Sequence, residues 1–224
     1  MSVMDFEFGL NLPIDGLQEL EEGVYFKHYG MDLTESGELQ ESMVSERFGE
    51  YEAKACFWQK QTEPLGESLA LQAMFESLVQ GTGVSQEQLR RDAIQQGRFQ
   101  PGCGTSLEDI EELLKQSSDD APIYVENRIG CTLAEIAEAV DTDGETLCYV
   151  SMLILDCEEL QDYPGLNADG LVHVTGISFQ DEEGDIVYIN DVTKDDGAGR
   201  KIPLDVFLRA WSASDYRAIT VSRG

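Results

Sequence analysis

Basic residues are scarce in this sequence of 224 residues. Lysine and arginine number 15 against 44 aspartates and glutamates, which gives a formal net charge of −29 at pH 7. A surface with this charge carries a broad negative potential that repels phosphate backbones and anionic lipids. Direct binding to nucleic acid or to a membrane is therefore not expected. The charge fits a solvated acidic surface that keeps the protein soluble, and it also fits a basic protein partner or mimicry of nucleic acid.

Long apolar runs are missing as well. No window approaches the roughly 18 apolar residues that a membrane-spanning helix needs, and no N-terminal stretch joins a basic region to an apolar core. The five cysteines are odd in number and form neither paired Cys-x-x-Cys motifs nor a cysteine–histidine metal pattern. We therefore expect a soluble, cytoplasmic protein with reduced thiols, without a metal and without another cofactor.

Apolar material is sufficient for one folded domain. Hydrophobic residues make up 42% and aromatic residues 8% of the chain, which argues against a wholly disordered protein. Residues 1–50 are acidic and rich in glycine, and they show no confident periodic element. This pattern predicts an N-terminal extension over 1–50 that packs on, or tethers, a main domain over 51–224.

The first part of the main domain has helical periodicity. Apolar residues recur at three- and four-residue steps over 67–80 and predict a helix that faces the core. A second helix is expected over 85–96, capped by Ser85, with Leu89, Ala93 and Ile94 facing inward. A third is expected from Ser106 through the leucines at 113 and 114.

Strand patterns dominate from residue 123 onward. Two helices interrupt them, over 133–140 after a Thr132 cap and over 203–211 with a proline in the first turn. The expected strands cover 123–125, 147–155, 171–179, 186–189 and 216–221. Helices followed by a sheet indicate an α+β architecture.

The stretch FWQKQTEPLGES at 57–68 resembles the active-site entry of bacterial papain-like cysteine peptidases related to the double-glycine leader peptidases, which process bacteriocins. Those proteins place a glutamine six residues before a cysteine that opens a helix. The glutamine amide stabilises an oxyanion, and the start of the helix favours the thiolate. In this chain Gln61 matches the glutamine, and Glu67 stands where the cysteine is expected.

Later segments resemble the same family over roughly residues 50–221. They include GRF at 97–99, GCGTS at 102–106, GCTL at 130–133, YIND at 188–191 and the closing stretch IPLDVFLRAW at 202–211. The family's general base is a histidine before the apolar run that resembles 171–177, and Gly170 occupies that position. Asp191 matches the acid that orients the base. His173 lies an odd number of positions along the strand from Gly170, on the opposite face, so we interpret it as structural.

The resemblance implies a papain-like fold in which an N-terminal helical half packs on an antiparallel sheet. It also implies a degenerate site, made of Gln61, Glu67, Gly170 and Asp191, that lacks both the nucleophile and the base. We therefore expect no enzyme but a protein that binds a peptide or a protein, with a basic partner favoured by the charge. Its work would be that of an adaptor, chaperone or inhibitor.

Other chemistry stays open from the residues themselves. Glu67 and Asp191 could act as a carboxylate pair in an altered hydrolase, or could hold a metal, whereas Glu67 at a helix start also has a structural role with the helix dipole. Ser68 has no identified base. Cys103, in a glycine-rich turn, and Cys131, at a helix start, have local settings that favour a thiolate but lack the family signature.

Overall fold

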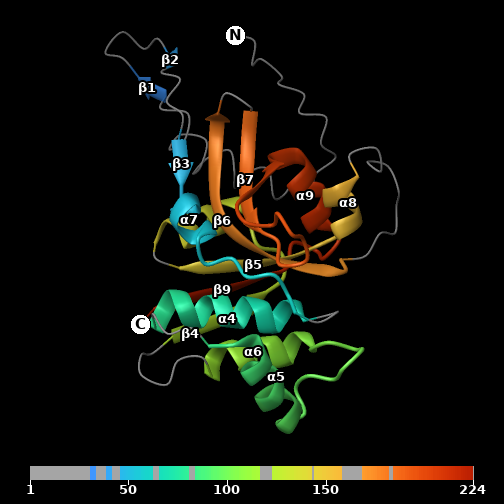
Figure 1. Ribbon diagram of the computed structural model, residues 1–224. Coiled ribbons are helices and arrows are strands. Elements are labelled where there is room, and N and C mark those ends of the chain that lie inside the picture. The colour runs from blue at the N-terminus through green and yellow to red at the C-terminus, as the bar shows by residue number, and fades with distance from the viewer. Residues whose placement is uncertain are drawn as a thin grey trace.

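Figure 1 shows the protein as a computed structural model, which describes residues 31–33, 39–41, 46–62, 66–80, 84–116, 123–142, 144–157, 168–181 and 184–223. The elements in chain order are β1 (Met31–Leu33), β2 (Leu39–Glu41), β3 (Glu46–Phe48), α3 (Tyr51–Ala55), α4 (Glu67–Gln80), α5 (Gln86–Gln95), α6 (Leu107–Gln116), β4 (Ile123–Arg128), α7 (Leu133–Asp141), β5 (Glu145–Val150), α8 (Met152–Asp156), β6 (Gly170–Asp181), β7 (Gly184–Asn190), β8 (Arg200–Pro203), α9 (Leu204–Ser212) and β9 (Ala218–Arg223).

The main sheet has seven strands. Six run in the order β4-β9-β5-β6-β7-β8, and β3 pairs with β6 beyond the end of β5. Every pairing is antiparallel. The expected extension over 1–50 lies largely outside the described residues, but β3 belongs to the main sheet because Phe48 pairs with Ile177. The short strands β1 and β2 pair with each other.

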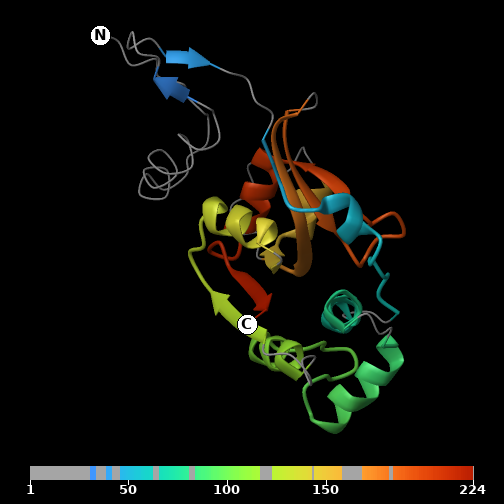
Figure 2. The same cartoon turned by 90° about the vertical axis from the view of Figure 1, so that its left-hand side faces the viewer.

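Helices cover both faces of this sheet (Figures 1 and 2). One core cluster joins the α7 and α9 side to strand residues such as Val172 and Val174, and a second joins α4 and α6 to Leu171 and Ile219. A third, smaller cluster packs α5 against α4. The alternation of neighbouring β6 residues between the two clusters follows from the period of two of a strand. The predicted mixture of helices and antiparallel sheet is thus confirmed.

Caps and periodicity place α4 and α5 where the sequence predicts them. Helix α4 covers the predicted 67–80, and α5 begins after Ser85, whose side chain accepts a hydrogen bond from the Gln88 N–H. The expectation for Ile94 is wrong: the residue is 38% exposed, whereas Leu89 and Ala93 are buried. The inward face of this short helix is narrower than the sequence suggested.

The apolar run at 147–155 is not one strand. Strand β5 ends at Val150, and α8 begins at Met152. The Ser151 N–H donates to the carbonyl oxygen of Ala210 in α9, and the Met152 N–H donates to the Asp169 carboxylate. These two hydrogen bonds turn the chain out of the sheet after Val150. The apolar pattern of 147–155 contains no signal that predicts them. Strand β8 was not predicted either, because it is short and begins with two basic residues.

Within the described residues, no helix has the length and apolar character needed to cross a bilayer.

Candidate functional site

A pocket of about 460 Å³ opens at the start of α4. Its wall combines Ser68 of α4, the turn at Cys103 and Thr105, the end of β5 at Tyr149 and the start of β6 at Gly170. The turn between α9 and β9 closes it with Asp215 and Arg217, among others. Segments far apart in the sequence therefore meet at one concave site, the common setting of a ligand-binding site.

Ser68 ties the first turn of α4 to the turn after α5. The Ser68 and Thr105 hydroxyls lie 2.7 Å apart and share a hydrogen bond. Gly102 and Gly104 flank Cys103 with positive φ angles of 79° and 77°, which lets the turn fold back sharply. Glu67 begins α4, and its side chain lies outside what the structure describes.

Gly170 lies on the wall of the same pocket, at the first position of β6. A Cβ atom at this position would lie 2.3 Å from the Met152 Cγ and 2.6 Å from its Sδ. A side chain at position 170 would therefore point at α8. The pocket thus lies between the start of α4 and position 170, where the base is expected. The Met152 side chain fills the space that the Cβ atom of a histidine at 170 would occupy.

Gln61 and Asp191 lie together elsewhere. The Gln61 N–H donates to the carbonyl oxygen of Val192 at 2.8 Å, so the two predicted site residues sit on neighbouring segments. Neither belongs to the described lining of the pocket. The Gln61 Oε1 atom is buried and has no hydrogen-bond partner among the described residues. Of the four predicted site residues, Gly170 belongs to the described lining of the pocket and Glu67 directly precedes the lining residue Ser68, whereas Gln61 and Asp191 lie on two segments outside that lining.

The Asp191 carboxylate is fully buried, and both of its oxygens are occupied. Oδ1 accepts hydrogen bonds from the Thr193 N–H at 2.9 Å and hydroxyl at 2.6 Å, and Oδ2 accepts one from Arg200. The Asp191 carbonyl oxygen accepts the indole N–H of Trp58 at 2.9 Å. Asp191 therefore stabilises the loop between β7 and β8 through hydrogen bonds to residues at both of its ends and to Trp58.

A buried glutamine holds the segment that carries Gln61. The Gln86 Oε1 accepts the Thr62 N–H at 3.0 Å, and its Nε2 donates to the Lys60 carbonyl oxygen at 2.9 Å. One side chain of α5 therefore replaces the backbone partners that the segment at 60–62 would otherwise lack. Nothing in the sequence pattern pointed to this role, because Gln86 lies in the first turn of a helix where polar residues are ordinary.

His173 belongs to a buried polar network under the middle of α4. Its Nε2 and the Glu145 Oε2 share a hydrogen bond of 2.6 Å, and its ring packs edge-on to Phe75 with centroids 5.4 Å apart. Lys54 pairs with the same Glu145 oxygen at 3.3 Å. Leu171, two residues before His173, packs in the α4-side cluster, whereas the Gly170 Cβ direction points to α8. The expected opposite orientation of positions 170 and 173 agrees with this packing.

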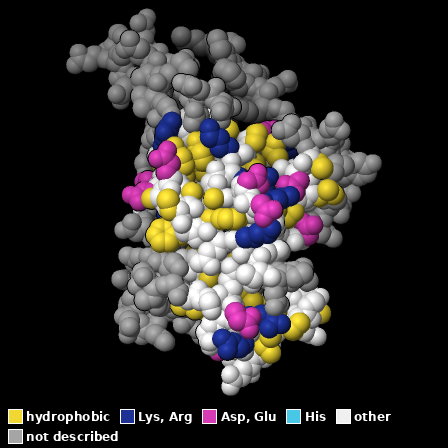
Figure 3. Space-filling view, viewed as in Figure 1, with side chains coloured by type: hydrophobic (Ala, Val, Ile, Leu, Met, Phe, Trp, Pro, Cys, Tyr) yellow, Lys and Arg dark blue, Asp and Glu magenta, His cyan; other side chains and the backbone are white. Residues whose placement is uncertain are grey.

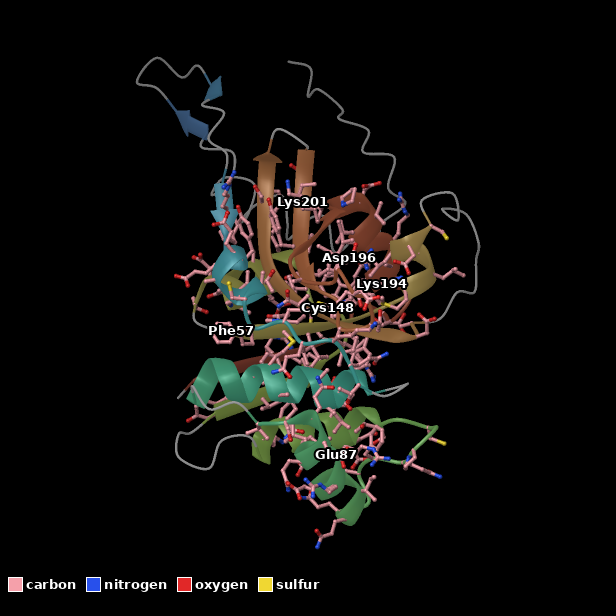
Figure 4. All side chains as sticks on the ribbon, in the orientation of Figure 1. Phe57, Glu87, Cys148, Lys194, Asp196 and Lys201 are labelled. Carbon is pink, nitrogen blue, oxygen red and sulfur yellow. The ribbon has the colours of Figure 1, made fainter. Side chains whose placement is uncertain are left out.

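The cysteines differ sharply in their surroundings. All five are free; Cys103 is exposed at the pocket, whereas Cys131 and Cys148 are buried. Burial raises the pKa of the Cys131 thiol, so its position at a helix start does not yield a thiolate. Cys148 lies within the sheet (Figure 4), and burial raises its pKa as well. Within the described part of the chain, no cluster of three metal-ligating side chains occurs.

Sequence reasoning missed two polar residues of the pocket, Tyr149 and Arg217. The Tyr149 hydroxyl is buried without a hydrogen-bond partner among the described residues, and burial raises its pKa, against the smaller opposing effect of the Arg217 charge. Asp215 and Tyr216, just before Arg217, both have positive φ angles, of 54° and 56°. Such backbone is costly for residues with side chains and concentrates at functional sites. Their sequence carries no glycine or asparagine signal for this turn.

Comparison with known proteins supports the fold. No family model and no curated protein matches the chain. A crystal structure from Bacillus anthracis, assigned to a C39-like peptidase, aligns with 80% of this chain and 98% of its own, with 16% sequence identity and a TM-score of 0.50. The chain therefore has a peptidase-like fold of helices on an antiparallel sheet, similar to that C39-like protein.

Proposed function

We propose that this protein is a non-hydrolytic homologue of papain-like peptidases, which binds a peptide segment in the pocket at the start of α4. The observation that carries the proposal is Gly170. It lies on the pocket wall at the position expected for the general base, and it brings no side chain. An adaptor, chaperone or inhibitor needs such a pocket without the chemistry.

Thiol chemistry needs a base beside the nucleophile. Cys103 lines the pocket, but no described residue of that lining is a histidine. His173 is fully buried and engaged by Glu145, and His28 lies outside the described residues. In comparable triads, removal of either partner costs most of the rate. The free state of all five cysteines suits a reducing compartment such as the cytoplasm.

A basic ligand suits the electrostatics. The chain carries a formal charge of −29, and the pocket is lined by two carboxylates, Asp169 and Asp215, against one cation, Arg217. A negative potential raises the association rate of a positively charged segment, and salt weakens this effect. The proposal therefore includes ligands with lysine or arginine near the bound segment.

The test is affinity selection from a random peptide library, followed by mass spectrometry of both bound and free peptides. We expect bound peptides to be recovered intact and to be enriched in lysine and arginine, with capture that falls as sodium chloride rises. Recovery of new peptide termini in the wild-type reaction would contradict the proposal.

Two glutamate variants separate binding from an altered hydrolase. Glu67→Gln changes the start of α4, and Glu87→Gln is a matched change in the first turn of α5, outside the lining of the pocket (Figure 4). Capture without cleavage in both variants supports binding. Cleavage that vanishes in Glu67→Gln alone would favour a hydrolase that uses Glu67 and Asp191. Release of a captured protein by duplex DNA would instead favour nucleic-acid mimicry.

A further inference from the structure

Arg217 is an unusual cation in this acidic protein. Several described cations lie against acids, as Lys60 does with Asp195 and Lys194 with Asp156. Arg217 lines the pocket, and no described acidic group lies within ion-pair distance of it. Its backbone is fixed, because the Arg217 N–H donates to the Ser214 hydroxyl at 3.2 Å. Arg217 is thus half-buried on a fixed backbone, and its guanidinium has no anionic partner among the described residues.

The Tyr149 hydroxyl lies near that charge. It is excluded from solvent, lacks a hydrogen-bond partner among the described residues, and has a pKa that burial raises further above its ordinary value. A buried hydroxyl without a partner destabilises the empty pocket, and an acceptor supplied by a ligand would remove this cost. Tyr149 therefore offers a second donor to the ligand.

Ser68 and Thr105 add hydroxyl groups to the same lining. Ser68 and Thr105 share one hydrogen bond, so one of the two hydroxyl protons is used between them and the other can be donated elsewhere. Of the two carboxylates in the lining, Asp169 already accepts the Met152 N–H at 2.8 Å, and Asp215 is exposed. The pocket lining is consequently rich in donors, and its two carboxylates are exposed, where a basic side chain of the ligand can meet them. A third exposed carboxylate, Glu108, acts on Tyr149 from outside this lining and adds slightly to the rise of its pKa.

We infer that Arg217, Tyr149 and the Ser68–Thr105 pair bind the C-terminal carboxylate of a peptide. A carboxylate has two oxygens that match the forked donors of arginine and a further acceptor site for a hydroxyl. A terminal carboxylate also lets the rest of the ligand remain basic, as the charge of the chain favours. The inference rests on the proposed function and names the end of the peptide that enters the pocket.

The experiment compares three pools of N-acetylated random pentapeptides in affinity selection. The first pool has free C-termini, the second is amidated, and the third is amidated with one glutamate per peptide. We expect wild-type protein to retain the first pool about tenfold more strongly than the second and third, as the loss of a charge-assisted hydrogen bond predicts. Equal retention of the first two pools would overturn the inference and leave peptide binding intact, whereas retention of the third pool as strongly as the first would assign the site to side-chain carboxylates.

Variants test the named donors. Arg217→Gln should abolish the preference for free C-termini, and Tyr149→Phe, which keeps the ring, should weaken it several-fold. Arg91→Gln, a matched change at an exposed arginine of α5, should preserve it. A preference that survives in Arg217→Gln would contradict the inference, and failure of all three pools to bind wild-type protein would overturn the proposed function as well. Circular dichroism of each variant identifies any that fails to fold, and the second variant then decides.

Discussion

At the scale of single residues, the charged core is the feature with the largest expected energetic effect. Glu145 accepts from Lys54 and shares a hydrogen bond with His173, and the Lys54 ammonium also donates to the Gly144 carbonyl oxygen at 2.9 Å. The Asn190 amide donates to the Lys54 carbonyl oxygen at 3.1 Å. The network therefore ties α3 to three neighbouring strands. Removing one partner would leave an uncompensated buried charge.

Glu145→Gln tests this network. We expect a loss of about 3 kcal/mol in the free energy of unfolding at pH 7, because Lys54 loses its buried counter-charge. Burial by itself would raise the pKa of Glu145, but the hydrogen bond with His173 and the Lys54 charge hold it below the ordinary 4.5. A lowered carboxyl pKa contributes stability above pH 4.5 that is lost as pH falls through the folded-state pKa.

Urea denaturation between pH 7 and pH 3 measures both effects. The wild-type protein should lose stability below pH 4.5, and Glu145→Gln should show a shallower decline in that range. Glu126→Gln, at an exposed position of β4, serves as the control and should follow the wild type. Parallel pH profiles for the wild type and Glu145→Gln would contradict a contribution of Glu145 to the loss of stability in acid.

Gly170 has no room for a side chain beside Met152. Gly170→Ala should destabilise the protein by about 1–3 kcal/mol, because the new Cβ would overlap the Met152 side chain. The added change Met152→Ala should recover part of that loss by opening the space. A double-mutant cycle measured by urea denaturation gives the coupling energy, and strictly additive losses would contradict the overlap. A histidine at 170 would meet the same obstacle, so any attempt to restore a base there needs a smaller residue at 152.

At the scale of elements, helices were easier to predict from sequence than strands and turns. Helices α4 to α7 have apolar residues at helical spacing, and two of them begin at caps that the sequence shows, Ser85 and Thr132. The prediction of one strand over 147–155 was wrong, because a continuous apolar run is compatible with either a strand or a helix. Tertiary contacts from Ala210 and Asp169 decide where β5 ends, and these lie far along the chain.

The cap of α7 gives a prediction with an internal control. The Thr132 hydroxyl accepts the Glu135 N–H at 3.2 Å, and the Glu135 carboxylate accepts the Thr132 N–H at 2.7 Å. Thr132→Ala should cost about 1 kcal/mol of unfolding free energy, because the Glu135 N–H loses its partner. Ser151 is the N-cap of α8, but its buried hydroxyl makes no hydrogen bond among the described residues. Ser151→Ala should therefore be nearly neutral, and a larger loss there than in Thr132→Ala would contradict the assignment of the caps.

For the molecule as a whole, the fold class and part of the candidate site could be predicted from the sequence. The glutamine motif and the strand near Gly170 are local patterns, and they led to the start of α4 and to one wall of the pocket. Tyr149 and Arg217 complete that pocket from the ends of other strands, so only their placement in three dimensions brings them together. The spacing of Tyr149 and Arg217 along the chain does not show that they line one pocket. Neither residue could therefore be predicted as a pocket residue from the sequence.

The excess of negative charge determines how the stability of the whole chain responds to salt. Figure 3 shows basic and acidic side chains side by side over the loop between β7 and β8, where Lys194 pairs with Asp156 and Arg200 with Asp191. Such pairs use most of the cations. The chain still has a net charge of −29, so the acids without a basic partner repel one another.

Raising sodium chloride from 0.01 M to 0.5 M shortens the screening length from roughly 30 Å to less than 10 Å. Relief of the repulsion should then outweigh the weakening of exposed ion pairs, each of which contributes about 1 kcal/mol or less. We expect the Tm to rise by about 2–4 °C, which corresponds to ~1 kcal/mol for a chain of this size. Calorimetry in sodium chloride and in glycerol, a neutral solute, separates screening from a general solute effect, and a Tm that falls with salt would show that the ion pairs outweigh the repulsion.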